Sequence, residues 1–283
     1  MKNKELAKFI SENYSINEYD LKNLNSIKKE VLERLESGGF ISFSQNYEDV
    51  ILRRIFNLKS KGTFVDVGAF HPFYNSNTYY FYNKGWRGLN IDMDDVNIKE
   101  FIRLRGEDLN MNIPISDKNE KIDTYIIKNS SRSSIIKEIA NINLKKDEII
   151  VQSKQEAKTL NTVLENNDIN DIDFISIDVE GAEDKVLKGF DIQKYSPKII
   201  IIESVFPQSS EIKSDEAQKT LQSSNYFPFY FDGINKFYCY EKNLEKYKGF
   251  VEIPPNYFDN FIRFKDILGM IDYWVEKVQK RFN

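Results

Sequence analysis

The sequence predicts an α/β fold with a mostly parallel β-sheet, a C-terminal hairpin, a helical N-terminal arm and a C-terminal helix. Short apolar runs alternate with amphipathic runs between residues 63 and 204, and this alternation is typical of βαβ crossovers and a parallel sheet. Two aromatic runs, 225–233 and 235–242, then follow with a single residue between them, which indicates a closing hairpin. With 41% hydrophobic residues, a chain of this length can bury a large core.

Both ends of the chain carry helical patterns. Apolar residues recur at helical spacing between Ile16 and Glu36, and Gly38 follows as a stop signal. We expect residues 1–42 to form a helical arm that packs on the core or on a second copy of the chain in a homodimer. Residues 264–282 show the same spacing, so 262–283 is the expected C-terminal helix.

Residues 43–261 make up the predicted α/β domain. Its parallel strands are expected at 63–68, 87–92, 109–116, 173–178 and 198–204, and its helices at 76–84, 96–105, 159–165 and 182–188. Residues 118–158 break this alternation, because they are polar and carry the stretch SSRSS at 130–134. We therefore expect an insertion or lid there.

The composition excludes several classes of protein. The net charge is −4, and no basic run interleaved with aromatic residues marks a nucleic-acid groove. A single cysteine, Cys239, rules out an internal disulfide framework and a multi-cysteine metal site. The N-terminus lacks the apolar stretch of a signal peptide, and no apolar run is long enough for a membrane span. A cytoplasmic protein is therefore expected.

The first candidate site is the turn VDVGAF, residues 65–70. It places Asp66 and Gly68 at the carboxyl edge of the sheet, where open α/β sheets bind ligands. Gly68 lets a ligand approach the main chain, although an ordinary strand-to-helix turn also fits. A dinucleotide fingerprint needs three glycines and the turn has one, so S-adenosylmethionine is favoured over NAD.

Asp92 closes the next predicted strand. Its separation from Asp66 is near the roughly 20 residues at which an acidic residue reaches an adenosine ribose. The alternative is that Asp92 caps the following helix, but Asp94 and Asp95 are available for that role.

A third pair, Asp178 and Glu180, lies in the turn IDVEGAE. These carboxylates could orient a hydroxyl, face a sulfonium or bind a divalent cation. An all-oxygen Mg²⁺ site is conceivable, but the spacing reveals no third ligand, so we expect no metal.

His71 directly follows the glycine turn and is the only histidine. No Ser/His/Asp triad elsewhere and no multi-histidine metal site is therefore possible. An ordinary histidine pKa of about 6.5 suits a general base, and a hydroxyl needs one to attack a methyl group. The alternative is that His71 only orders the turn.

Several segments together carry a family resemblance. They are SQNYED (44–49), VDVGAFHPFYNSNTYYFYNKGWRG (65–88), NIPIS (112–116), ISIDVEGAEDKVLKGF (175–190), and FDGINKFY (231–238) with PPNYFDNF (254–261). From about residue 43 to residue 261 the chain resembles the FkbM family of S-adenosylmethionine-dependent methyltransferases. FDGINKFY is similar to a branch that acts on sugars in surface-polysaccharide assembly.

The resemblance implies a Rossmann-like methyltransferase fold and a role for each matching position. Asp66, Gly68 and Ala69 would form the cofactor floor, Asp92 would hold the ribose, and Ile115 and Ser116 would flank the adenine. Gln45, Ser76 and Asn77 would reach the methionine moiety, while Asp178 and Glu180 would face the methyl group or the acceptor. Phe70 departs from the small polar residue common in relatives.

The function implied is O-methylation of a sugar, free or nucleotide-activated, in surface-polysaccharide biosynthesis. N- or C-methylation of another small metabolite is the alternative. A NAD(P)-dependent sugar-modifying enzyme is disfavoured by the missing glycines, and a non-catalytic domain by the carboxylates at the strand ends.

Overall fold

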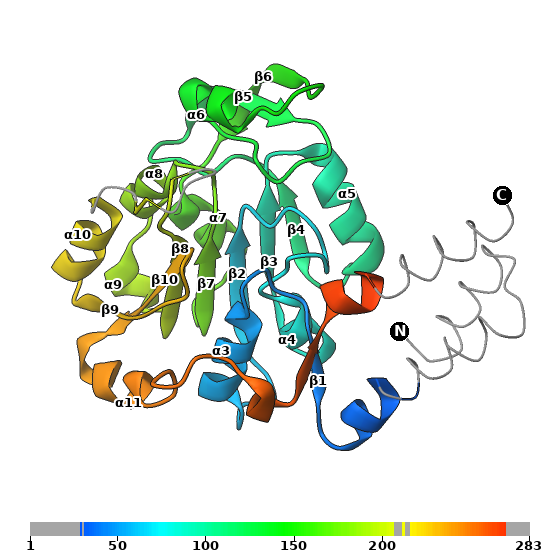
Figure 1. Ribbon diagram of the computed structural model, residues 1–283. Coiled ribbons are helices and arrows are strands. Elements are labelled where there is room, and N and C mark those ends of the chain that lie inside the picture. Colours follow the sequence, from blue (N-terminus) through cyan, green and yellow to red (C-terminus); the bar gives the residue numbers. More distant parts are fainter. Residues whose placement is uncertain (1–28, 30, 207–210, 213–215, 270–283) are drawn as a thin grey trace, which may run out of the picture. The chain divides into compact units, whose positions relative to one another are not determined.

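The computed structural model describes residues 29, 31–206, 211–212 and 216–269, which fall into two compact units (Figure 1). The larger unit is Ser44–Pro254, and the smaller one combines Met1–Phe43 with Pro255–Asn283. In the smaller unit, β1 (Phe40–Ser42) pairs in parallel with β11 (Phe261–Arg263), which η2 (Tyr257–Asp259) precedes. Residues 31–36 and 264–269 are helical, while the rest of the two predicted terminal helices lies outside the described residues.

A seven-stranded sheet forms the centre of the larger unit, in the order β4–β3–β2–β7–β8–β10–β9. Its parallel strands are β2 (Thr63–Val67), β3 (Arg87–Asp92), β4 (Leu109–Asn112), β7 (Phe174–Ile177) and β8 (Ile199–Glu203). β10 (Asn235–Tyr240) runs antiparallel to both β8 and β9 (Tyr226–Phe231). The predicted α/β fold with a mostly parallel sheet and a C-terminal hairpin is therefore confirmed.

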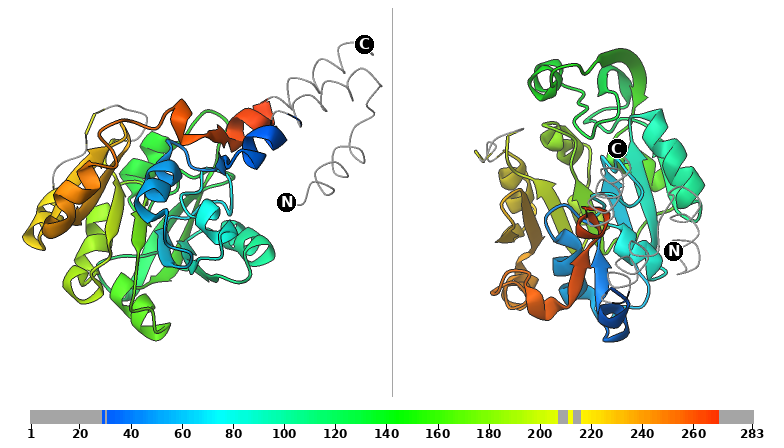
Figure 2. Two further views of the ribbon diagram at one scale, coloured as in Figure 1. Left: turned by 90° about the horizontal axis from the view of Figure 1, so that it is seen from below. Right: turned by 45° about the vertical axis from the view of Figure 1, so that its right-hand side comes forward.

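Helices cover both faces of this sheet (Figure 2), because successive strand residues point to opposite faces and both faces are apolar. Val65 and Val67 share one buried cluster with residues of α7 (Leu160–Asn166), α8 (Glu183–Lys188), α9 (Ile192–Tyr195) and α10 (Glu216–Ser223). Phe64 shares the other with residues of α3 (Glu48–Phe56), α4 (Tyr79–Asn83) and α11 (Leu244–Lys248), which η1 (Glu241–Asn243) precedes. None of the helices in the described ranges has the length and apolarity of a membrane span.

A second, two-stranded sheet lies within residues 118–158, where we expected an insertion. It pairs β5 (Glu120–Ile127) with β6 (Ile150–Ala157) in antiparallel fashion, and α6 (Lys137–Asn143) lies between them in sequence. Figure 1 shows these elements above one end of the large sheet. The backbone of Ser116 donates to Lys158 O (3.0 Å), and that of Lys158 donates to Pro114 O (3.1 Å), so the insertion is anchored beside the chain that leaves β4.

Two predicted elements exceed the observed ones by more than two residues. The helix expected at 76–84 begins at Tyr79, because Ser76 Oγ accepts the backbone N–H groups of Thr78 (3.3 Å) and Tyr79 (3.1 Å) and holds a turn there. The strand expected at 109–116 ends at Asn112, just before Pro114, which has no N–H to donate to a strand ladder.

Candidate active site

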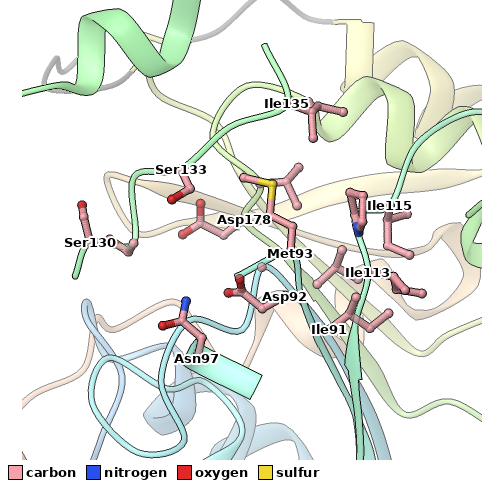
Figure 3. A pocket seen from close by; sticks show the side chains of 16 residues that line it. Ile91, Asp92, Met93, Asn97, Ile113, Ile115, Ser130, Ser133, Ile135 and Asp178 are labelled. Atoms are coloured by element: carbon pink, nitrogen blue, oxygen red, sulfur yellow. The ribbon is translucent and has the colours of Figure 1, made fainter. Parts of the chain in front are cut away.

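A pocket opens at the carboxyl edge of the large sheet (Figure 3). It encloses about 520 Å³ of space, part of it open to solvent, and it lies where open α/β sheets bind their ligands. The lining residues lie at or after the carboxyl ends of β2, β3, β4 and β7, or belong to α5 (Asp95–Leu104) and the insertion. They are Val67, Gly68, Ile91, Asp92, Met93, Asn97, Ile113, Pro114, Ile115, Ser130, Ser131, Ser133, Ile135, Asp178, Val179 and Ala182.

The pocket has an apolar side and a polar side. Figure 3 shows Ile91, Ile113 and Ile115 gathered on one side. The oxygen-bearing side chains, Asp92, Asn97, Ser130, Ser133 and Asp178, lie on the other. An amphipathic small molecule that carries a flat apolar group and several hydroxyl or ammonium groups would fit this division.

The floor of the pocket is a close contact between two strand ends. Gly68 has φ +83°, and a Cβ on it would lie 1.7 Å from the carbonyl oxygen of Asp178. The backbone N–H groups of Gly68 and Ala69 both donate to Ile91 O, at 2.9 and 3.0 Å. Only glycine fits this position, and the two N–H groups of the turn already have acceptors.

Asp92 is held with its carboxylate at the pocket. Its Oδ2 accepts the backbone N–H of Phe70 (2.9 Å) and its Oδ1 that of Asp94 (2.7 Å). Burial raises the pKa of Asp92 to about 6. The cap of α5 is Asp94, whose side chain accepts from Val96 N (3.0 Å), so Asp92 is not the capping residue.

Asp178 lies at the pocket end of a group of three carboxylates. Oxygens of Asp178, Glu183 and Glu203 come within 4.8 Å of one another, a set of hard ligands that could hold Mg²⁺ or Ca²⁺. Glu183 Oε1 also accepts the backbone N–H of Gly181 (3.1 Å). The third carboxylate comes from β8, which the local spacing around Asp178 could not reveal.

Residues 66–243 match the family model of the methyltransferase FkbM domain, which is more than half of the chain. The chain belongs to the FkbM methyltransferase family. No curated protein and no solved structure matches it. The matched range contains the glycine turn, the whole insertion and every residue that lines the pocket. It leaves out SQNYED and PPNYFDNF, two segments of the resemblance.

Of the residues that the FkbM resemblance implied, the pocket gathers Gly68, Asp92, Ile115 and Asp178. Asp66 does not line it, because it precedes Val67 on the strand and so points to the opposite face of the sheet. There it is buried and accepts a hydrogen bond from Thr78 Oγ1 (3.1 Å). Burial raises the pKa of Asp66 to about 6, against the lowering effect of Arg105.

Glu180 turns toward the insertion of the FkbM domain rather than into the pocket. Its backbone is left-handed, with φ +51°. Its Oε2 accepts from Asn143 Nδ2 (2.9 Å), and its carbonyl oxygen accepts from Ser134 Oγ (2.8 Å). It is not among the lining residues.

His71 lies outside the pocket lining as well. Its Nδ1 accepts the backbone N–H groups of Phe73 (3.3 Å) and Tyr74 (3.1 Å), and burial lowers its pKa. A neutral imidazole that accepts through Nδ1 carries its proton on Nε2. In this arrangement the histidine orders the turn and has no ring nitrogen left to accept a proton.

The remaining implied residues also lie away from the pocket lining. Ala69 packs with Ile98 and Phe101, Gln45 is exposed, and Ser76 holds the turn before α4. Ser116 Oγ donates to Asp117 (3.0 Å), and Asn77 Nδ2 donates to Ser176 Oγ (3.0 Å).

Sequence reasoning missed the contributions of Met93, Asn97 and three insertion serines. Met93 directly follows Asp92, so its place after a strand end was a usable signal. The serines of SSRSS signalled an insertion or lid, but nothing in the sequence says which strand ends they approach.

Proposed function

We propose that this FkbM methyltransferase uses S-adenosylmethionine to methylate a hydroxyl of a sugar, free or nucleotide-activated, in surface-polysaccharide biosynthesis. The observation that carries the proposal is the pocket, in which Asp92 lies on one side and a group of isoleucines on the other, with Gly68 among the lining residues. Ile91, Ile113 and Ile115 offer an apolar slot for the adenine. The Asp92 oxygens, fixed by two backbone N–H groups, suit the ribose hydroxyls.

The glycine turn favours this cofactor over a dinucleotide. A pyrophosphate is bound by backbone N–H groups that point at it, whereas those of Gly68 and Ala69 donate to Ile91 O. The N–H groups of these two residues therefore do not point at a pyrophosphate, and this supports an adenosine ligand that carries an amino acid.

When bound, S-adenosylmethionine supplies an electrophilic methyl group on a positively charged sulfonium. The residues of this chain would hold the cofactor at Asp92 and take a proton from the attacking hydroxyl at a carboxylate oxygen of Asp178. We favour Asp178 over His71 as the general base, because His71 Nδ1 already accepts two N–H groups. N- or C-methylation of another small metabolite is the alternative, and the acceptor experiment must distinguish it from O-methylation of a sugar.

Calorimetry tests the cofactor. We expect S-adenosylmethionine and S-adenosylhomocysteine to bind and NAD to give no heat, and tight NAD binding with no response to either sulfur nucleoside would overturn the proposal. Mass spectrometry of reactions with a panel of nucleotide sugars then tests the acceptor, since an added methyl group identifies both the molecule and the methylated atom.

A pair of variants tests the base. A general base contributes about 10² to 10⁴ in rate, so Asp178→Asn should lower turnover within that range, whereas His71→Ala should keep most of it. Cofactor affinity, measured alongside, should change by only a few-fold in both. The reverse result, with His71→Ala inactive and Asp178→Asn active, would make His71 the base.

A further inference from the structure

The insertion and the turn that carries Asp178 meet at one amide group. Asn143, the last residue of α6, is fully buried. Its Nδ2 donates both to Glu180 Oε2 (2.9 Å) and to the carbonyl oxygen of Arg132 (3.1 Å). Arg132 belongs to the pocket-lining stretch SSRSS, and Glu180 lies two residues after Asp178. A single side chain therefore joins two segments of the chain, each of which carries residues that line the pocket.

Other contacts strengthen the same junction. Ser134 Oγ donates to the carbonyl oxygen of Glu180 (2.8 Å), and both residues are buried. Ile139 of α6 packs against Gly181, since an added Cβ there would lie 3.1 Å from its side chain. Arg132 donates back to the carbonyl oxygen of Asn143. The insertion thus contacts the Glu180–Gly181 backbone through several residues, with Asn143 at the centre.

The turn needs such support. Glu180 and Gly181 both have left-handed backbones, with φ +51° and +94°. This conformation is costly for a residue with a side chain and persists where surrounding contacts fix it. On its other side, Asp178 N donates to Val67 O (3.0 Å). The backbone of Asp178 is therefore held by the sheet on one side, and the turn that follows it is held by the insertion on the other.

We propose that Asn143 is a positioning residue, which couples the serine stretch over the cofactor pocket to the placement of the Asp178 carboxylate. The inference rests on the proposed function, in which the pocket binds the cofactor and Asp178 takes the proton. A ligand that orders the serine stretch would then also order the turn that carries Asp178.

The decisive variant is Asn143→Asp, which places a second carboxylate against Glu180. The double variant Asn143→Asp/Glu180→Gln restores an amide–carboxylate pair with the roles reversed. Asn141→Asp is the matched control, because Asn141 is exposed on the same helix. Hydrogen exchange is measured in two segments, 130–135 and 177–183, with 63–67 of β2 as the internal reference.

Without ligand, Asn143→Asp should speed exchange in both segments by about 10-fold or more, the equivalent of a lost hydrogen bond to a charged group. The reference strand should stay unchanged, and Asn141→Asp should match the natural chain. The double variant should recover much of the lost protection. Unchanged exchange at 177–183 in Asn143→Asp, or a double variant no better than the single one, would overturn the coupling.

With S-adenosylhomocysteine added, both segments of the natural chain should become protected together, whereas in Asn143→Asp the protection should stay within 130–135. Equal protection of 177–183 in both proteins would overturn the inference while leaving the proposed function intact. Absence of binding to the natural chain would overturn the proposed function, and with it the cofactor part of the coupling.

Discussion

Glu48 is a buried carboxylate that joins two segments far apart in sequence. Its Oε1 accepts from Asn235 Nδ2 (2.8 Å), and its Oε2 accepts the backbone N–H of Asn46 (2.7 Å). Burial and the nearby Asp232 raise the pKa of Glu48 from 4.5 to about 8. SQNYED and FDGINKFY, two segments of the family resemblance, thus meet at a carboxyl group that stays protonated at neutral pH.

This protonation makes stability depend on pH. Between about pH 5 and 8 the native chain keeps a proton on Glu48 that the unfolded chain has lost, so the free energy of unfolding should fall as the pH rises. Glu48→Gln mimics the protonated carboxyl group. We expect this variant to make the slope of the unfolding free energy against pH less steep, by at most about 1.4 kcal/mol per pH unit.

Urea unfolding across this pH range measures the slope. Asp66 and Asp92, whose pKa values are also raised to about 6, remain in both proteins, so the difference between the slopes reports Glu48 together with Asp232, whose charge acts on it. Glu241→Gln, at an exposed position, is the control. Equal slopes for the natural chain and Glu48→Gln would contradict the assignment.

The Asp92 carboxylate is expected to contribute directly to the affinity for the cofactor. Asp92→Ala should weaken S-adenosylhomocysteine binding by about 10- to 150-fold, the range for one hydrogen-bonding site on a charged group. Calorimetry measures the affinity and circular dichroism checks the fold. Asp95→Ala, which removes an exposed carboxylate on α5, should bind normally. An unchanged dissociation constant for Asp92→Ala would mean that Asp92 only holds its own loop.

Among the elements, β2 and β7 depend on Gly68 for their close approach. Gly68→Ala should destabilise the protein severely, because the new Cβ would overlap the carbonyl oxygen of Asp178 in addition to straining a backbone at φ +83°. Gly85→Ala is the matched control, since φ is +89° there and nothing lies within 4 Å of an added Cβ.

Backbone strain alone typically costs about 1 to 2 kcal/mol, so we expect that loss for Gly85→Ala and at least twice as much for Gly68→Ala. Thermal and urea unfolding of the two variants give the comparison. If both variants lose the same free energy, the strand ends have room to separate and Gly68 is required only for its φ.

At the scale of the whole molecule, sheet order brings together carboxylates that are distant in sequence. Asp178 and Glu183 follow β7, while Glu203 ends β8, so their oxygens meet only in the folded chain. We expect methyl transfer to persist in EDTA, because Glu183 Oε1 already accepts a backbone N–H. Full loss of activity in EDTA, restored by Mg²⁺ but not by Na⁺, would show that the three carboxylates hold a metal ion.

The central strands could be predicted because each is a short apolar run between breakers, and β2, β3, β7 and β8 lie where such runs occur. Gly68, Asp92 and Asp178 could be assigned to the pocket from the sequence, because parallel strands end at one edge of the sheet. Asp66 could have been assigned to the opposite face from strand alternation alone. Glu203 and the serines of the insertion could not be foreseen, because their positions depend on sheet order and on a loop that crosses back over the pocket.

The place of β7 beside β2 also has a consequence for the chain during its synthesis. β2 is made early and can pair with β3 on one side, but its other partner follows only after β4 and the whole insertion. At about 5 to 20 residues per second, the apolar edge of β2 emerges from the ribosome many seconds before β7 can cover it. During this period the nascent protein exposes an unpaired strand edge at its future pocket. Chaperones are expected to bind the chain mainly in that period.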